Sequence, residues 1–401
     1  MRPITTGDSD LVKNLNLGIV LDLIREKGSL SRASVAKITG MSRSTCSIIV
    51  DQLIASGLVV ESGKDASTGG RKPILVRINH DAGMVIGVKI MREKVVAAIV
   101  DLKGEAVITA EEEVGEPDGI APYLKSLVKI IRRLVRSEKA REGKKLLGIG
   151  IGISGLVDFD SGISIDSSIT HWKNVPLRAI LKKEFALPVY LEKDVNTFAI
   201  GEKWLGIGRA MDNFICVTIG RGVGVGIIIN GSVYRGSHHG AGEFGHVKVS
   251  DATDAPICSC GRKGCIEAFA SNPAICDYVQ KTLRRGEKSI LKKGELTIEA
   301  ILAAAKKGDP TARAAFQRAG RYLGYGVANL INLFDPEAII ISGEGTVAGE
   351  FILPEMENAI RENSIYGLHE KVKRIPLYFE DNMWVRGVAT LVVREVFKIP
   401  L

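Results

Sequence analysis

The stretch GAGEFGH at residues 240–246, followed after eleven residues by CSCGRKGCIE at residues 258–267, combines metal-binding side chains with closely spaced glycines. It contains one imidazole and three thiols, on His246, Cys258, Cys260 and Cys265. Three thiolates and a histidine suit tetrahedral Zn²⁺, and four protein ligands leave no position open for catalysis. The pattern therefore predicts a structural zinc site around which the rest of the chain is organised.

The alternatives for these cysteines are simple burial or a disulfide. A disulfide is disfavoured because the N-terminus, with Asp8 and Asp10, is no secretory signal. Gly261 and Gly264 lie between the second and third thiols, where a chain wrapped around a metal needs unusual backbone angles. Glu243 and Glu267 bracket the cluster, so folding around a metal would bring two carboxylates to one place.

These two motifs resemble the signature of the ROK family, named for repressors, open reading frames and sugar kinases. The signature is highly specific, and the resemblance extends over nearly the whole chain. It implies an actin-like, ribonuclease-H-like α/β fold with two lobes and a ligand in the cleft between them. Glu243, His246 and Glu267 match family positions that contact or frame the sugar. A zinc-bound His246 could still donate a hydrogen bond through its second ring nitrogen.

Composition places few limits on the partner but points to DNA for one part of the chain. The 401 residues are 45% hydrophobic and 25% charged, as in soluble globular proteins. No apolar run reaches the roughly 18 residues of a membrane span, so we expect a cytoplasmic protein without a membrane partner. Residues 1–80 carry 11 Lys/Arg against 7 Asp/Glu, which is half of the net charge of +8. That concentration favours a polyanion partner for the N-terminal fifth.

Residues 14–56 show the spacing of three short helices. Apolar side chains recur at helical intervals in residues 17–24, and Gly28 ends that helix. Ser31 can cap a second helix and Ser42 a third, after the turn at Gly40. Helices so arranged form a helix-turn-helix, in which the first turn of the last helix reaches base edges in the major groove. The residues predicted to do so are Arg43, Ser44, Thr45 and Ser47.

Two strand-like runs, residues 58–61 and 74–78, follow the helices and predict a hairpin. Its basic tip contains Arg71 and Lys72, so the region resembles a winged helix-turn-helix whose wing contacts DNA. The alternative is a helical dimerisation module, which would present an apolar face instead of a polar, cationic one. Cys46 falls on the buried stripe of the third helix and is expected to be a core residue.

The remaining residues read as two successive units, each with three strands followed by alternating helices and strands. Such repetition predicts an internally duplicated, two-lobed α/β body. We therefore expect a DNA-binding domain at residues 1–80, a first lobe at 81–196 completed by a C-terminal helix at 385–401, and a second lobe with the zinc insert at 197–384.

The nucleotide motifs of ROK kinases are altered in this chain. A kinase of this fold cradles ATP phosphates with bare glycine backbone. Where the family has Gly-Val-Asp-Ile-Gly-Gly-Thr, this sequence has Lys89 for the acid and Met91 and Arg92 for the glycines. The family's Gly-Thr-Gly becomes Gly220-Arg221-Gly222, and its later Gly-Gly becomes Gly343-Glu344-Gly345. The sequence therefore argues against phosphoryl transfer.

The sugar-binding motif of the family is retained more fully than the nucleotide motifs. Residues 192–196, Glu-Lys-Asp-Val-Asn, resemble the family's Glu-Asn-Asp-x-Asn, whose aspartate is the general base. Asp194 matches it and can bind sugar hydroxyls without chemistry. Asn174 is a further candidate sugar ligand, with Trp172 as a wall residue. For each carboxylate taken alone, a solvated surface charge is the ordinary interpretation; their joint match favours a sugar site.

We therefore predict a sugar-responsive transcriptional regulator, a repressor of carbohydrate-utilisation genes, that has lost ATP chemistry. It would bind operator DNA as a homodimer or homotetramer, because two recognition helices must meet two half-sites. The chief alternative is an ATP-dependent sugar kinase that retains a DNA-binding module. A constitutive architectural DNA-binding protein without a ligand is the third hypothesis.

Overall fold

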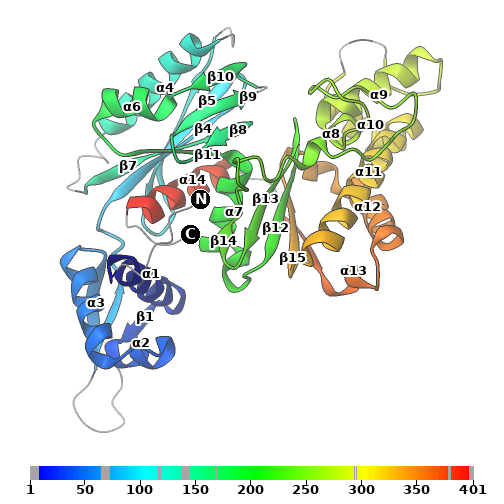
Figure 1. Cartoon of the computed structure of the whole chain (residues 1–401). Coiled ribbons are helices and arrows are strands. Elements are labelled where there is room, and N and C mark those ends of the chain that lie inside the picture. The colour runs from blue at the N-terminus through cyan, green and yellow to red at the C-terminus, as the bar shows by residue number, and fades with distance from the viewer. Residues whose placement is uncertain are drawn as a thin grey trace. The chain divides into compact units, whose positions relative to one another are not determined.

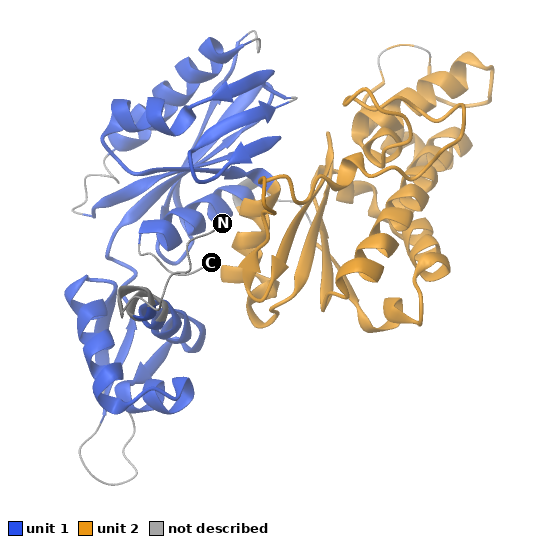
Figure 2. Ribbon diagram, viewed as in Figure 1, with its two compact units in different colours: residues 1–194, 384–401 blue, residues 195–383 orange. Residues whose placement is uncertain are grey.

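The computed structural model describes residues 9–64, 73–115, 119–137, 144–167, 169–292, 294, 296–377 and 381–396 (Figure 1). The chain divides into two compact units, coloured separately in Figure 2. Unit 1 comprises Met1–Asp194 with Trp384–Leu401, and unit 2 comprises Val195–Met383. Among the described residues, every helix is too short or too polar to span a bilayer.

The N-terminal part of unit 1 has the winged helix-turn-helix arrangement that the sequence predicts. Its elements are α1 (Ser9–Lys27), β1 (Ser29–Ser31), α2 (Arg32–Thr39), α3 (Arg43–Ala55), β2 (Val59–Lys64) and β3 (Ile74–Ile78). The hydroxyls of Ser31 and Ser42 cap α2 and α3, each accepting a backbone N–H three residues on. Strand β1, which the sequence does not predict, pairs with β3 and widens the hairpin to three strands.

The rest of unit 1 is built on a five-stranded sheet of order β11-β7-β4-β5-β6. Its strands are β4 (Met84–Ile90), β5 (Lys94–Asp101), β6 (Ala106–Glu113), β7 (Leu146–Ile153) and β11 (Val189–Lys193). The first three pair antiparallel; β7 pairs parallel with β4, and β11 pairs parallel with β7. Every residue of β4 is buried, as expected for a strand covered on both faces.

Helices cover both faces of this sheet (Figure 1). Helix α4 (Ile120–Val135) and helix α6 (Leu177–Phe185) contribute to the core on one face. Helix α14 (Asp381–Val396) packs on the other through Val385, Ala389 and Val392. Gly87 makes this approach possible, because a Cβ there would lie 2.6 Å from the Val385 carbonyl oxygen. The C-terminal helix therefore belongs to the first sheet.

A small antiparallel sheet in unit 1 has order β10-β9-β8 and was not predicted. It consists of β8 (Leu156–Asp158), β9 (Ile163–Ser167) and β10 (Trp172–Val175). These strands are short and their apolar residues few, so periodicity gives little signal. Gly155 marks their start: it has φ +106°, and a Cβ there would lie 2.2 Å from the Asp166 carbonyl oxygen.

Unit 2 repeats the strand order of the first five-stranded sheet. Its sheet has order β14-β13-β12-β15-β16, built from β12 (Phe214–Ile219), β13 (Val223–Ile229), β14 (Ser232–Val233), β15 (Ala338–Ser342) and β16 (Lys373–Pro376). Again the first three strands are antiparallel, and two later strands add parallel beside the first. The predicted internal duplication is therefore confirmed, and with it the actin-like architecture.

The helices of unit 2 surround this sheet and supply most of its core. They are α7 (Asp194–Trp204, whose first residue belongs to unit 1), α8 (Glu267–Ala270), α9 (Asn272–Arg284), α10 (Ile298–Lys306), α11 (Pro310–Phe334), α12 (Gly349–Asn363) and α13 (Leu368–Lys371). Three 3₁₀ turns accompany them, η1 (Ile207–Ala210), η2 (Phe244–His246) and η3 (Glu344–Ala348).

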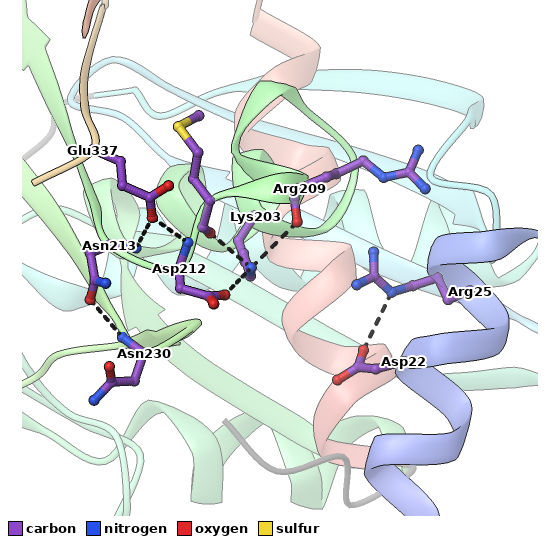
Figure 3. Close-up of polar contacts among 9 residues, drawn as sticks. Asp22, Arg25, Lys203, Arg209, Asp212, Asn213, Asn230 and Glu337 are labelled. Atoms are coloured by element: carbon purple, nitrogen blue, oxygen red, sulfur yellow. Dashed lines mark hydrogen bonds and ion pairs between the residues drawn. The ribbon is translucent and has the colours of Figure 1, made fainter. Parts of the chain in front are cut away.

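A polar cluster fixes the start of β12 in unit 2 (Figure 3). One oxygen of Glu337 accepts the backbone N–H groups of Asp212 and Asn213, at 2.8 and 2.9 Å. The Lys203 ammonium, at the end of α7, donates to the Met211 carbonyl at 2.8 Å and contacts Asp212 at 3.1 Å. These hydrogen bonds connect α7 with the residues that precede β12 and β15.

Helices α11 and α12 lie side by side, and two glycines set their separation (Figure 1). A Cβ on Gly320 would lie 2.2 Å from the Ile352 carbonyl oxygen, and one on Gly324 would lie 2.5 Å from that of Met356. Alanine would ordinarily favour a helix by about 1 kcal/mol over glycine. Gly324→Ala should nevertheless lower the free energy of unfolding by about 1–3 kcal/mol, because overpacking outweighs propensity.

Urea denaturation of this variant can be compared with Gly349→Ala, at the start of α12. There a Cβ meets only the Leu353 side chain at 3.4 Å or more. That substitution should be neutral or slightly stabilising. Equal effects of the two substitutions would contradict the packing argument.

Candidate functional site

The GAGEFGH stretch lies along strand β13, and its glycines permit this close contact. Gly242 has φ +84°, and a Cβ there would lie 2.4 Å from the Val225 carbonyl oxygen. A Cβ on Gly245 would lie 2.2 Å from the carbonyl oxygen of Val223. Two residues separate these glycines: Phe244 is buried, whereas Glu243 is exposed. The buried ring of Phe244 therefore anchors the turn, and the side chain of Glu243 is exposed to solvent.

The four predicted metal ligands come together in unit 2. Their ligand atoms, on His246, Cys258, Cys260 and Cys265, all lie within 4.8 Å of one another. The Cys258 Sγ lies 3.6 Å from His246 Nδ1, and the Cys260 Sγ lies 3.8 Å from that of Cys265. The cluster could hold a metal ion.

Short backbone bridges shape the loop that carries the thiols. Cys265 pairs with Lys248, and Lys263 pairs with Ile257. Gly264 has φ +76°, and a Cβ there would lie 2.0 Å from the Ser250 carbonyl oxygen. Gly261 has φ +82° in open space. Both glycines thus have the left-handed angles that the sequence predicts.

Protons compete with a cation for these thiols. Burial and the neighbouring Cys260 thiol raise the pKa of Cys265 to about 12. Burial also raises the pKa of Cys258. Burial acts in the same direction on Cys260, but the Arg262 N–H and the two adjacent thiols outweigh it and lower its pKa. A bound divalent cation would therefore have to displace protons from at least two of the thiols.

Glu267, the first residue of α8, joins the cysteine loop to strand β13. Its Oε2 accepts the Val223 backbone N–H at 3.2 Å, and its Oε1 accepts the Ser259 hydroxyl at 2.9 Å. Oε1 also lies 3.9 Å from the Cys258 Sγ. The sequence identifies the carboxylate but gives no signal for Ser259 or Val223 as partners, because their proximity depends on how the loop folds back. Glu267 thus has a structural role beside any role in ligand binding.

Aromatic stacking holds α8 in place. The ring of Phe269 stacks on that of Tyr322 in α11, with centroids 3.6 Å apart. The guanidinium of Arg318 lies 4.5 Å from the Phe269 centroid and 4.8 Å from that of Tyr278 in α9. This cation–π cluster fixes the helix from which Glu267 projects.

The other predicted sugar ligands lie in unit 1. Asp194 is half-buried at the start of α7, directly after β11. Asn174 is exposed in β10 with φ +52°. The expectation that Trp172 lines a sugar site is wrong, since it is a core residue: it is 2% exposed, and its ring packs edge-on against Tyr123 at 5.4 Å.

In unit 1 the altered nucleotide motif carries a buried cation. Lys89, in the central strand β4, is 9% exposed, and its ammonium lies 3.8 Å from the centroid of the Trp384 ring. The ROK resemblance implies a magnesium-binding aspartate at this place. A buried ammonium repels Mg²⁺, so the substitution removes a ligand and adds an opposing charge.

In unit 2 the altered motif Gly220-Arg221-Gly222 forms the turn between β12 and β13. The Gly220 N–H donates to the Gly222 carbonyl at 3.0 Å. A Cβ on Gly220 would lie 3.3 Å from Oε2 of Glu344, so a carboxylate stands beside the turn. Phosphate groups would be repelled there.

We therefore expect no ATP-dependent phosphorylation of common hexoses or pentoses. A coupled assay of ADP release with the purified protein should give the same background as Asp194→Asn, because Lys89 and Glu344 oppose magnesium and phosphate. Sugar-dependent turnover that is lost in Asp194→Asn would contradict this expectation.

The candidate DNA-reading helix is α3. At its start Arg43 and Ser44 are exposed, and Thr45 and Ser47 are half-buried. The Ser42 hydroxyl accepts the Thr45 N–H at 3.1 Å and lies 2.9 Å from that of Ser44. This arrangement leaves an exposed, cationic and hydroxyl-rich first turn. The predicted wing contacts, Arg71 and Lys72, lie outside the described residues.

The opposite side of α3 is apolar and buried, as predicted. Cys46 is completely buried, its thiol donates to the Arg32 carbonyl at 3.2 Å, and burial raises its pKa. The Arg32 guanidinium also pairs with Asp51 at 2.6 Å. Helices α2 and α3 are thus fixed to each other by a core and by a polar contact.

Comparison with known proteins supports both the N-terminal DNA-binding domain and the ROK body that follows it. Residues 85–395 match the ROK family, and residues 19–60 match the winged helix-turn-helix DNA-binding family. The xylose repressor of Caldicellulosiruptor bescii is 33% identical over 400 residues, which cover 98% of this chain and 99% of that protein. The transcriptional dual regulator NagC of Escherichia coli is 33% identical over 360 residues, covering 90% and 87% of the two chains.

Solved structures of regulators and kinases differ in how much of this chain they match. A ROK family transcriptional regulator, a homologue of the Escherichia coli MLC protein, superposes with a TM-score of 0.85 at 31% identity, covering 97% of this chain and 98% of that one. A ROK glucokinase of Streptomyces griseus, solved with glucose and AMPPNP, gives 0.65 at 30% identity and covers 77% of this chain and 99% of its own. The regulators match 90–98% of this chain, whereas the glucokinase matches 77%, which confirms the prediction of a non-enzymatic regulator. The chain belongs to the ROK family, in its branch of transcriptional regulators with a winged helix-turn-helix.

Proposed function

We propose that this protein is a cytoplasmic repressor that binds operator DNA through α3 and its wing and changes its DNA affinity when a neutral monosaccharide binds. The observation that carries the proposal is the contrast between two kept sites and one altered site. The exposed first turn of α3 and the exposed Glu243 support DNA binding and sugar binding, whereas Lys89 and Glu344 oppose ATP binding.

The sugar ligands in this proposal are the five residues predicted from the sequence, Asn174, Asp194, Glu243, His246 and Glu267. Each carboxylate offers two acceptor oxygens and no donor, which suits a polyhydroxylated ligand. The relatives are named for xylose and N-acetylglucosamine, and the glucokinase structure contains glucose. These three sugars are therefore the first candidates for the effector.

The metal in this proposal is a structural Zn²⁺. A tetrahedral zinc with Zn–S bonds of about 2.3 Å holds its ligand atoms about 3.8 Å apart. The distances of 3.6 and 3.8 Å within the cluster fit that arrangement. Because Nδ1 of His246 faces Cys258, the imidazole Nε2 is the nitrogen that would donate to a sugar hydroxyl.

A homodimer, or a tetramer built from dimers, completes the proposal. Two copies of α3 must reach two half-sites about one helical turn apart on the duplex. Sugar binding would then act by favouring a conformation in which the two helices no longer match that spacing. Only a difference in sugar affinity between the two states can produce this effect.

DNA binding tests the proposal directly. A duplex selected from random sequence by the purified protein should bind with an affinity that falls steeply between about 50 and 200 mM salt, because phosphate contacts release counterions. Arg43→Ala should weaken binding to that duplex by roughly 1–3 kcal/mol and relax the preference at one base pair, if Arg43 reads a base edge.

Arg361→Ala, a change of an exposed arginine in α12, is the matched control and should leave DNA affinity unchanged. One of the three candidate sugars should release the wild-type protein from the selected duplex. Failure to select any preferred sequence would refute the regulator assignment. A sequence-specific but sugar-independent complex would instead favour a constitutive DNA-binding protein.

A further inference from the structure

The recognition helix carries an exposed isoleucine that the predicted DNA contacts do not include. Ile48 lies one turn after Ser44, and 59% of its surface is exposed. Its neighbours Ile49 and Val50 are buried. Because exposed apolar residues are common on protein surfaces, exposure alone indicates no ligand. The position of Ile48 on α3 is the informative feature.

Ile48 lies in the middle of the solvent-exposed stripe of α3. Ser44, Ile48 and Asp51 follow one another at intervals of four and three residues, so they share one face. The buried residues Cys46, Ile49, Val50 and Leu53 form the opposite stripe. The face that includes Ile48 therefore begins with residues that are predicted to enter the major groove.

The ends of this exposed stripe differ in charge. Arg43 and Ser44 at the start of the helix offer a cation and a hydroxyl to base edges or phosphates. Further along, the carboxylate of Asp51 would be repelled by DNA, and Arg32 neutralises it at 2.6 Å. Base contacts are therefore expected over the first two turns of α3. Ile48 is the apolar side chain that projects from that segment.

We infer that Ile48 reads the 5-methyl group of a thymine in each operator half-site. In the major groove that methyl is the apolar feature that separates thymine from cytosine, and apolar side chains contact it. The inference rests on the proposed DNA-binding role of α3. It adds a hydrophobic specificity contact to the polar contacts of Arg43 and Ser44.

Replacing thymine by deoxyuridine removes only this methyl group and leaves base pairing intact. In the selected duplex, each such replacement should weaken wild-type binding by roughly fourfold, from about 0.8 kcal/mol per buried methyl-sized group, so replacing one thymine in both half-sites should weaken it by roughly fifteenfold. Ile48→Ala should bind the thymine and deoxyuridine duplexes equally. Its affinity for non-specific DNA and its melting temperature should stay at the wild-type values, because the side chain is largely exposed.

Ile38→Ala is the matched control, because Ile38 is 54% exposed but lies on α2. It should retain the wild-type ratio between the two duplexes, measured by fluorescence anisotropy. The inference is wrong if no deoxyuridine replacement weakens the wild-type protein, or if the ratio persists in Ile48→Ala. If no preferred duplex can be selected, the proposed regulator function itself is wrong. If a duplex is selected but its deoxyuridine form binds equally well, only the thymine contact of Ile48 is wrong.

Discussion

Replacing Cys265 by serine should remove the bound metal and lower the melting temperature of the protein by roughly 10 °C or more. Structural zinc sites contribute on the order of 10 kcal/mol in small zinc-dependent peptides, and 1 kcal/mol shifts the melting of a domain of this size by about 2–4 °C. Cys265 is buried and holds the loop both by its thiol and by pairing with Lys248. Elemental analysis and calorimetry would measure the two effects together.

Wild-type protein should contain close to one zinc per chain, and a strong chelator should produce the same destabilisation as the substitution. Cys276→Ser is the matched control, since this half-buried cysteine of α9 lies outside the cluster. It should keep both its zinc and most of its stability. A Cys265→Ser protein with unchanged melting, or a wild-type protein without metal, would refute the structural zinc site.

Glu243→Gln should abolish the response of the protein to its sugar while leaving the fold intact. The side chain is exposed at the start of the η2 turn, so the amide creates no packing defect. The substitution replaces a carboxylate, to which sugar hydroxyls donate strong hydrogen bonds, with a neutral amide. At a sugar concentration about 100 times the Kd, wild-type protein should gain about 2.7 kcal/mol. That gain corresponds to roughly 5–10 °C in the melting temperature of a domain of this size.

A thermal-shift screen with xylose, N-acetylglucosamine and glucose should identify one sugar with this effect. The variant should show no shift, while its zinc content and DNA affinity remain those of the wild type. Glu350→Gln, at an exposed position in α12, provides the control and should respond as the wild type does. A full shift in Glu243→Gln would exclude that carboxylate from the sugar site.

Much of the strand architecture could be predicted from the sequence, because central strands are continuous apolar runs ended by turn residues. The apolar runs at residues 94–101, 146–153, 214–219, 223–229 and 338–342 predict strands with the bounds that β5, β7, β12, β13 and β15 have. The helix α9 was missed, although its buried residues Ile275, Val279 and Leu283 recur at helical spacing after the Ser271 cap. The cap and this spacing together predict a helix over these residues.

The candidate site was predictable to a different degree in each part. Motif residues identified the metal cluster, because ligands close in sequence need only one loop to meet. The bonds from Glu267 to Ser259 and Val223 were not predictable, since they depend on the left-handed angles of Gly261 and Gly264. The stacking of Lys89 on Trp384 joins residues almost 300 positions apart, and no local pattern encodes it. The roles of the sugar and DNA residues stay predictions.

The position of α14 has a consequence for synthesis of the chain. This helix covers one face of the first sheet, yet the ribosome makes it only after all 189 residues of unit 2. At about 5–20 residues per second, translation of unit 2 takes roughly 10–40 s. During that interval Val85, Val96 and Val100 lack the apolar side chains of α14, so we expect nascent unit 1 to bind chaperones and prematurely terminated chains to aggregate.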